Sequence, residues 1–310
     1  MQELVADVAL GLRRNYDRRT CRPLTRETVT RQPDRAWLTG IATSLTGVDG
    51  VVGVLLGGSR ARGDHSPDSD VDLGVYYRPP LDVEALTELA RQIASARESG
   101  GLVTVTRPGD WGPWVDGGAW LSIDGVPVDW IYRDLDRVHA AWTDACAGRY
   151  RFHVQAGHPL GVPDFAYAGE VGLGTVLADP TGELTGLHAR TQDYPPALAE
   201  ALVDGLWEAR FLVAGARKAA ARTDTAWIAG CLFRAVGVCM HALHGHAGRW
   251  LVNEKGAVRS AGALPGSPAD FARRAHALLG DVGTTPEELA ASLDAADELI
   301  TDTARLCTAG

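Results

Sequence analysis

The stretch LLGGSRARGDHSPDSDVDLGVYY, residues 55–77, leaves an apolar run at Gly-Gly-Ser and returns to an apolar run that carries two alternating aspartates. The run VVGVLLG, 51–57, has the length and β-branched content of a buried strand, and DVDLGVYY, 70–77, alternates as a second strand does. Residues two apart in a strand face the same way, so Asp70 and Asp72 share one face while the apolar residues between and after them pack on the other.

Two carboxylates on one face repel each other unless a divalent cation lies between them. Oxygen ligands of this kind suit Mg²⁺, which proteins hold through one or two carboxylates together with substrate phosphates. The Gly57-Gly58-Ser59 turn lets the backbone approach a ligand closely, and amides at a turn that leads into a helix bind phosphate. Strand, turn and acidic strand together predict a site for a magnesium–nucleotide.

The segment GGSRARGDHSPDSDVDL, 57–73, resembles the signature of the nucleotidyltransferases related to DNA polymerase beta, in which Gly-Ser is followed about ten residues later by Asp-x-Asp. The small antibiotic-modifying members of that family, which place a nucleotide on aminoglycosides or lincosamides, carry a similar arrangement. The family takes a third carboxylate from a later strand, and Asp129 in VPVDWIY matches it here. The resemblance covers residues 51–77 and 119–133.

The resemblance implies roles for these acids. Asp70 and Asp72 would hold one or two Mg²⁺ ions that bridge the triphosphate oxygens of an NTP. Asp129 would either complete the second metal site or act as general base toward the acceptor hydroxyl, and the sequence leaves both roles open.

Further residues would hold the triphosphate. Gly58 and Ser59 are expected at the terminal phosphates, with Arg62 either assisting them or simply solvated. Of 30 basic residues only Lys218 and Lys255 are lysine, and a lysine that persists under such an arginine bias suits a position that needs a compact ammonium. Because the family's helical domain commonly lends a basic residue to the triphosphate, Lys218 is assigned this role, against the alternative of a solvated helical face. Lys255 is the second candidate.

Patterns outside the motif place it in a domain. Helical spacing begins at Asp34, and 81–98 predicts an amphipathic helix. The segment 119–134 contains two strand-like runs around Asp124-Gly125, a strong hairpin signal, and 135–147 returns to helical spacing.

The second half of the chain differs from the first in composition and in its predicted secondary structure. A glycine-rich piece, 169–184, predicts a strand that ends in a turn, whereas 197–247 and 268–306 are alanine- and leucine-rich helical sequence. The fold class is therefore α+β. The predicted units are an N-terminal lead-in (1–33), a mixed-sheet nucleotidyltransferase catalytic domain (34–195) and a C-terminal helical bundle domain (196–310).

Composition excludes several other classes of protein. The net charge of −9 disfavours nucleic acid as a partner, and five scattered cysteines without a C-x-x-C pair indicate neither a disulfide framework nor a zinc site. The N-terminus lacks the apolar core of a signal peptide, and no run approaches eighteen consecutive apolar residues. We expect a cytoplasmic protein without a membrane span.

The predicted function is a magnesium-dependent nucleotidyltransferase that moves an NMP, AMP from ATP by analogy with related small-molecule enzymes, onto a hydroxyl and releases pyrophosphate. Two alternatives remain. The acceptor is a protein or an RNA end, or the chain is a non-catalytic nucleotide sensor, although the complete set of acids argues against the sensor.

The acceptor is expected in a cleft bordered by Asp129, by Glu208 as a further candidate base, and by Trp111 or Trp114. Acidic walls with aromatic platforms favour an aminoglycoside-like or other amino-bearing small molecule. For Glu208, an ion pair with Arg210 or Arg217 is the alternative, and for the tryptophans it is the cover of a sheet edge.

Overall fold

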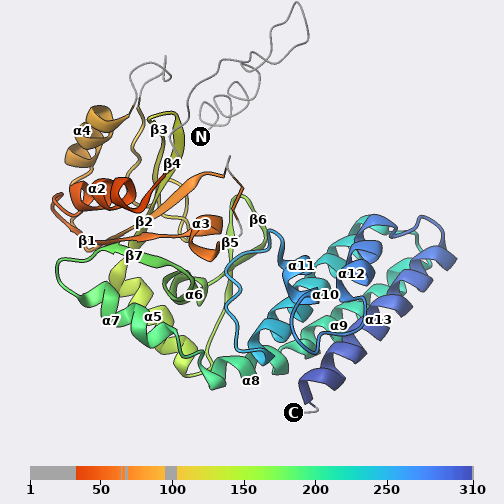
Figure 1. Cartoon of the computed structure of the whole chain (residues 1–310). Helices are drawn as coiled ribbons and strands as arrows, with labels where there is room; N and C mark the ends of the chain where they lie inside the picture. Colours follow the sequence, from red (N-terminus) through yellow and green to blue (C-terminus); the bar gives the residue numbers. More distant parts are fainter. Residues whose placement is uncertain (1–32, 64, 67–68, 95–102, 309–310) are drawn as a thin grey trace, which may run out of the picture.

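The two strands that flank the Gly-Gly-Ser turn lie side by side at the centre of a mixed sheet. The computed structural model describes residues 33–63, 65–66, 69–94 and 103–308. Its main sheet has the strand order β3–β4–β2–β1–β7, in which β2 and β4 are parallel and the other neighbours antiparallel (Figure 1). The strands are β1 (Val51–Leu56), β2 (Val71–Tyr77), β3 (Gly118–Ile123), β4 (Val126–Asp134) and β7 (Thr175–Ala178).

The predicted hairpin is confirmed as β3 and β4. Its turn residues Asp124 and Gly125 both have positive φ, 53° and 78°, as a two-residue turn that follows the twist of the sheet requires. A second hairpin, β5 (Phe152–Gln155) and β6 (His158–Pro163), lies between the main sheet and the C-terminal helices (Figure 1).

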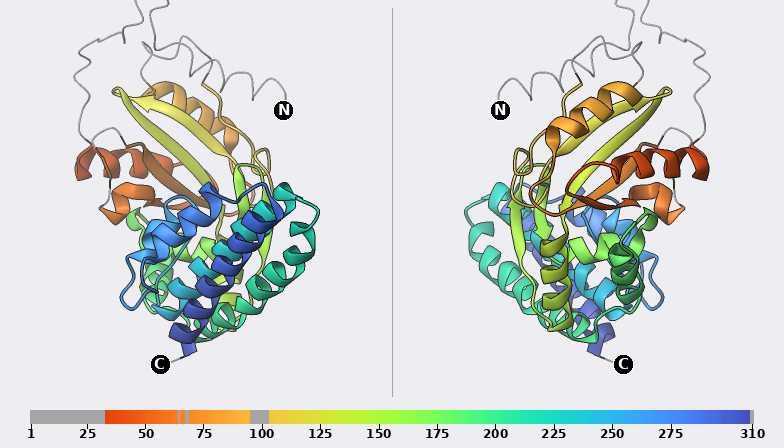
Figure 2. Two further views of the ribbon diagram at one scale, coloured as in Figure 1. Left: turned by 90° about the vertical axis from the view of Figure 1, so that its right-hand side faces the viewer. Right: turned by 90° about the vertical axis from the view of Figure 1, so that its left-hand side faces the viewer.

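Helices cover both faces of the sheet, as Figure 2 shows from two sides. Leu73, Val128 and Trp130 face α2 and α4 in one core, and Leu55 and Tyr76 face α5, α6 and α7 in another. Each strand therefore buries alternate residues on opposite sides. The helices of this part are α2 (Arg35–Leu45), α3 (Gly58–Arg62), α4 (Val83–Ile93), α5 (Leu135–Cys146), α6 (Ala166–Leu173) and α7 (Glu183–Thr191).

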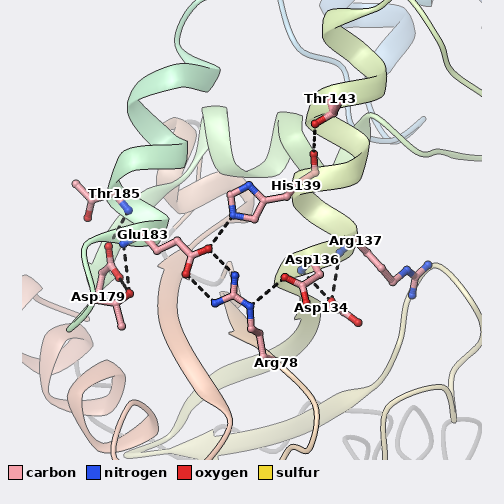
Figure 3. Close-up of polar contacts among 10 residues, drawn as sticks. Arg78, Asp134, Asp136, Arg137, His139, Thr143, Asp179, Glu183 and Thr185 are labelled. Carbon is pink, nitrogen blue, oxygen red and sulfur yellow. Dashed lines mark hydrogen bonds and ion pairs between the residues drawn. The ribbon is translucent and has the colours of Figure 1, made fainter.

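A charged cluster ties α5 and α7 to the end of β2 (Figure 3). Arg78 donates to both carboxylate oxygens of Glu183, at 2.7 and 2.6 Å, and to Asp136 at 3.0 Å, while His139 contacts the same Glu183 at 3.0 Å. Hydrogen bonds from Arg78 lower the pKa of Glu183 to about 2. This cluster lies at the opposite end of β2 from Asp70, and Arg78 bridges carboxylates of α5 and α7, so it fixes both helices to the sheet.

The glycine-rich piece 169–184 differs from its prediction in part. Its first residues complete α6, and the predicted strand follows as β7. Gly169 and Gly172 are needed for packing, because a Cβ there would lie 2.8 Å from Val252 and 2.7 Å from Trp250. A close approach between two segments, rather than a turn, explains these glycines.

The C-terminal region is helical, which confirms the predicted fold class. Its core joins apolar residues of α9 to α13 around the long helix α10. The helices are α8 (Pro196–Asp204), α9 (Leu206–Ala220), α10 (Thr225–His246), α11 (Ala257–Gly262), α12 (Phe271–Gly280) and α13 (Pro286–Thr308). The division at residue 196, where α8 begins, stays a prediction.

Among the described residues, α10 alone is long and apolar enough to cross a membrane by length and composition. Of its most apolar window, 67% is buried inside the protein, as in the core helix of a helical domain. The apolar character of α10 is thus accounted for by packing against its neighbours.

Candidate functional site

Asp72 and Asp129 are direct neighbours across the parallel strands β2 and β4. Both are half-buried, and Asp70 lies one residue before β2 and is exposed. The residues that alternate with them, among them Val71 and Val128, are fully buried on the opposite face. The strand register therefore brings together the three acids that the sequence singled out.

The electrostatics of these acids show mutual repulsion. Burial, reinforced by the nearby charges of Asp72 and Asp70, raises the pKa of Asp129 to about 7. Burial and Asp70 likewise raise the pKa of Asp72. Burial and neighbouring negative charge thus both disfavour ionisation of Asp72 and Asp129, and a positive charge bound beside them would offset this effect.

The backbone of the turn at Gly57 and Gly58 lies in close contact with Asp72. The backbone N–H of Gly57 donates to the carbonyl oxygen of Asp72 at 2.8 Å. Gly58 has a φ of +62°, and a Cβ there would stand 1.8 Å from Oδ2 of Asp72, so no side chain fits. Ser59 follows in the first turn of α3. Glycine is therefore required by both backbone conformation and space.

The two arginines of α3 have different surroundings. Arg60 donates from Nε to the carbonyl oxygens of Ser69 and Asp70, both at 3.1 Å, and so anchors the segment that leads into β2. Arg62 borders the cavity beside Asp72 and opposes the rise in the pKa of that carboxyl. The arginine predicted to assist phosphate binding is thus placed beside the acids.

A cavity of about 290 Å³ joins the turn, the sheet and the C-terminal region. The segment that follows α10 contributes Val252, Asn253 and Lys255 to its wall. Lys255 lies close enough to Asp72 and Asp129 to oppose the rise in the pKa of both. The other residues that line the cavity are Leu55, Gly57, Gly58, Ser59, Arg62, Asp72, Gly74, Tyr76, Ile131, Arg133, Glu170, Leu173 and Gly174.

Lys218 lies elsewhere. It is exposed on α9 and is not part of the cavity wall, so of the two lysines the structure brings Lys255 to the acids. Because Lys255 lies in a segment between two helices, its approach to β2 depends on how the helical region packs against the sheet. Local sequence patterns do not contain that information.

The inner wall of the cavity holds an ion pair that sequence reasoning missed. Buried Arg133 of β4 donates from Nε and Nη2 to the two carboxylate oxygens of Glu170, at 2.6 and 2.7 Å. Arg133 stands four residues after Asp129 and hence on the same face of the strand. That alternation was a usable signal, whereas the position of Glu170 on α6 was not.

Within the described residues, no group of three or more His, Cys, Asp or Glu side chains is spaced to hold a metal ion. The pair of Asp72 and Asp129 nevertheless fits Mg²⁺, because this ion needs only one or two protein carboxylates and takes its remaining ligands from water and substrate phosphates. Asp72 and Asp129 with Asp70 beside them are the residues that would hold it. Their roles stay predictions.

Glu208 is in an ion pair with a partner that was not expected. Its carboxylate accepts from Nε and Nη2 of Arg234 on α10, at 2.7 and 3.0 Å, rather than from Arg210 or Arg217. Arg217 instead pairs with Asp294. Glu208 is not among the charges that shift the pKa of Asp72 or Asp129, so the structure does not bring this candidate base to the other acids.

The predicted aromatic residues separate into two groups. Trp114 stacks on His153, with ring centroids 4.0 Å apart, and the Arg137 guanidinium lies over its ring. Trp111 stacks on Trp120 of β3, with centroids 4.3 Å apart and planes 15° from parallel. The first group lines a separate hollow beside α5, and the second lies on the sheet next to β4.

Comparison with known proteins agrees with this geometry. Residues 41–102 match a family model described as a nucleotidyltransferase domain, and this range contains β1, the glycine turn and Asp70 and Asp72. The match is confined to this part of the chain, which includes two of the three acids that the sequence singled out. No curated protein matches the chain.

Among solved structures, a nucleotidyltransferase-like protein from Exiguobacterium sibiricum 255-15 is similar, with 14% identity and a TM-score of 0.36. The similarity covers 84% of this chain and 71% of that one.

Proposed function

We propose that the protein is a magnesium-dependent nucleotidyltransferase that moves an NMP, AMP from ATP, onto a hydroxyl of a small molecule. The observation that carries this proposal is the register of β2 and β4, which sets Asp72 beside Asp129 at the glycine turn. Phosphoryl-type transfer depends mainly on positioning and charge stabilisation, and this arrangement supplies acids for a cation and close backbone for phosphates.

The donor would lie in the cavity with its triphosphate between Lys255 and the turn at Gly58 and Ser59. The ammonium of Lys255 and the guanidinium of Arg62 are positive charges on this wall. Asp70 and Asp72 would hold Mg²⁺, which would neutralise negative charge on the triphosphate and leave Asp129 free to act as general base. The ion pair of Arg133 and Glu170 also lines the cavity and fixes the position of both charged groups.

The transfer itself needs one bond to form and one to break. The acceptor oxygen forms a bond to the α-phosphorus of the NTP, and the bond from that phosphorus to the bridging oxygen of the β-phosphate breaks, so pyrophosphate leaves. The proton of the acceptor hydroxyl passes to the carboxylate of Asp129, which is half-buried and adjacent to Asp72. The products are the nucleotidylated acceptor, pyrophosphate and one proton.

The acids also support the choice of acceptor. Asp70 is exposed at the mouth of the site, and Asp72 and Asp129 extend the negative charge inward. Such a surface attracts cations and repels anionic groups, which favours an amino-bearing small molecule over an RNA end. An aminoglycoside-like compound, with ammonium and hydroxyl groups on neighbouring carbons, meets both demands.

A transfer assay tests the proposal. The protein is incubated with Mg²⁺, each NTP labelled at the α-phosphate, and a panel of hydroxylated acceptors that includes aminoglycosides, neutral sugars, a protein extract and RNA. We expect label on an aminoglycoside, with ATP as the preferred donor, and transfer about 10³-fold slower in Asp72→Asn. As a control, Asp193→Asn removes an exposed carboxylate outside the cavity and should leave transfer unchanged. NTP binding without transfer to any acceptor would indicate a nucleotide sensor instead.

A further inference from the structure

The row of site residues continues beyond Asp129 onto β3. Trp120 is the direct register partner of Asp129 in the antiparallel pair of β3 and β4, just as Asp72 is its partner on the other side. Directly opposed residues project from the same face of a sheet. Asp72, Asp129 and Trp120 thus stand in one line across three strands, about 5 Å from one strand to the next.

Trp120 is exposed where its neighbours on the same strand are not. It is 55% exposed, while Ala119 and Leu121 beside it are buried on the opposite face. One side of its ring is already covered by the stacked ring of Trp111. Trp111 itself is half-buried, so it backs the exposed ring of Trp120, whose other side stays open to a ligand.

The second ring of this pair is held in place by the β5–β6 hairpin. Buried Gln155 donates from Nε2 to the carbonyl oxygen of Trp111 at 2.8 Å. Its Oε1 accepts from the backbone N–H groups of Trp114 and Val115, at 3.0 and 3.2 Å. The loop that carries Trp111 is therefore fixed before any ligand arrives, so a ligand would meet a preformed surface.

The position of this surface relative to the donor cavity determines its use. The glycine turn follows β1, so the order across the sheet is turn, Asp72, Asp129 and Trp120. A nucleophile must approach the α-phosphorus from the side opposite the leaving pyrophosphate. With the terminal phosphates at the turn, that side is the one where Asp129 and Trp120 lie.

We propose that the stacked pair of Trp120 and Trp111 is the acceptor platform, and that it binds a six-membered ring that carries an ammonium group. This inference rests on the proposed function. The indole face attracts cations and packs against the C–H face of a sugar ring, and the carboxylate of Asp129 one strand away attracts the same charge. A ring seated on Trp120 holds its hydroxyl toward Asp129, the group that takes its proton.

The experiment measures ligand binding without chemistry. Isothermal titration calorimetry is carried out in Mg²⁺ with saturating α,β-methylene-ATP, which binds as a donor and does not react. Kanamycin, whose rings carry ammonium and hydroxyl groups, is the acceptor probe, and maltotriose is an uncharged sugar with the same number of rings. We expect kanamycin to bind wild-type protein and Trp120→Ala to bind it about tenfold more weakly, with partial recovery in Trp120→Phe. Maltotriose should bind more weakly than kanamycin throughout.

Trp227→Ala is the matched control, because Trp227 is 57% exposed but lies at the start of α10. It should bind kanamycin as the wild-type protein does, and every variant should bind α,β-methylene-ATP equally.

Equal kanamycin affinity in Trp120→Ala and wild type would overturn the proposed platform and leave the nucleotide site unaffected. The same holds if the protein binds α,β-methylene-ATP but no kanamycin. A change in the solution mass of the protein on Trp120→Ala would also overturn it, since it would assign the pair to a contact between copies. Failure of the wild-type protein to bind α,β-methylene-ATP would instead refute the proposed function.

Discussion

We expect the free energy of unfolding of the protein to fall as pH rises from 5 to 8. Replacing Asp129 by asparagine should remove much of this fall. The pKa of Asp129 is raised from 3.8 to about 7 in the folded protein by burial and by Asp72 and Asp70. A carboxyl whose pKa is raised on folding stabilises the folded state when protonated, so its contribution is fully present below pH 3.8 and is lost as pH rises through 7. Asparagine keeps the shape and the polar group but cannot ionise.

The magnitude follows from the two pKa values. Each tenfold change in the ionisation constant is equivalent to about 1.4 kcal/mol, so ionised Asp129 destabilises the folded state by about 4 kcal/mol once pH exceeds 7. At pH 5 the same site already contributes about 2 kcal/mol of this loss, because the unfolded carboxyl is ionised there. Between pH 5 and pH 8, the free energy of unfolding of wild type should fall by about 2–3 kcal/mol more than that of Asp129→Asn.

Urea unfolding followed by far-UV circular dichroism, in EDTA at pH 5 and pH 8, measures this difference. The control Asp193→Asn should behave as wild type does. Addition of Mg²⁺ at pH 8 should stabilise the wild-type protein, by about 2.7 kcal/mol at 100 times the dissociation constant, and stabilise Asp129→Asn less. Identical pH dependence in wild type and Asp129→Asn would refute the conclusion that burial and the neighbouring acids raise the pKa of Asp129.

Three further predictions concern the donor side. Asp72→Asn should lower the kcat of nucleotidyl transfer by about 10³-fold without loss of stability, and near-normal transfer would show that the cation lies elsewhere. Lys255→Ala should raise the dissociation constant for NTP at least about tenfold in a direct binding assay, whereas Lys218→Ala should not change it; the reverse result would assign the phosphate contact to α9. Gly58→Ala should abolish transfer, because its Cβ would lie 1.8 Å from Oδ2 of Asp72. The control Gly63→Ala carries similar backbone strain, at a φ of +76°, but its Cβ would have no atom within 4 Å, so this variant should stay active.

Much of the fold was predictable because its elements carry strong local signals. Asp34 caps α2, Asp82 caps α4, and Asp124-Gly125 adopts the two positive φ values that its hairpin needs. The glycine piece 169–184 was predicted less well. Gly169 and Gly172 pack closely against Val252 and Trp250, which are far away in the sequence. A local sequence pattern does not predict such a contact.

The sequence by itself determined which chemistry the site could perform. Two aspartates with a spacing of two share a face in any strand, and Gly-Gly-Ser before them makes a turn that the backbone of few other residues could form. These consequences arise from dihedral angles and from the period of a strand, which act over a few residues. The glycine turn and the two alternating aspartates could therefore be located without coordinates.

Tertiary structure alone decided which distant residues complete the site. The parallel register of β2 and β4 sets Asp129 beside Asp72, and the register of β3 adds Trp120 to the same row. Packing of the helical region on the sheet brings Lys255 into the cavity and leaves Lys218 exposed on α9. The physical reason is that strand pairing and helix packing minimise the exposed apolar surface of the whole chain, so the position of any one polar residue depends on residues far from it in the sequence.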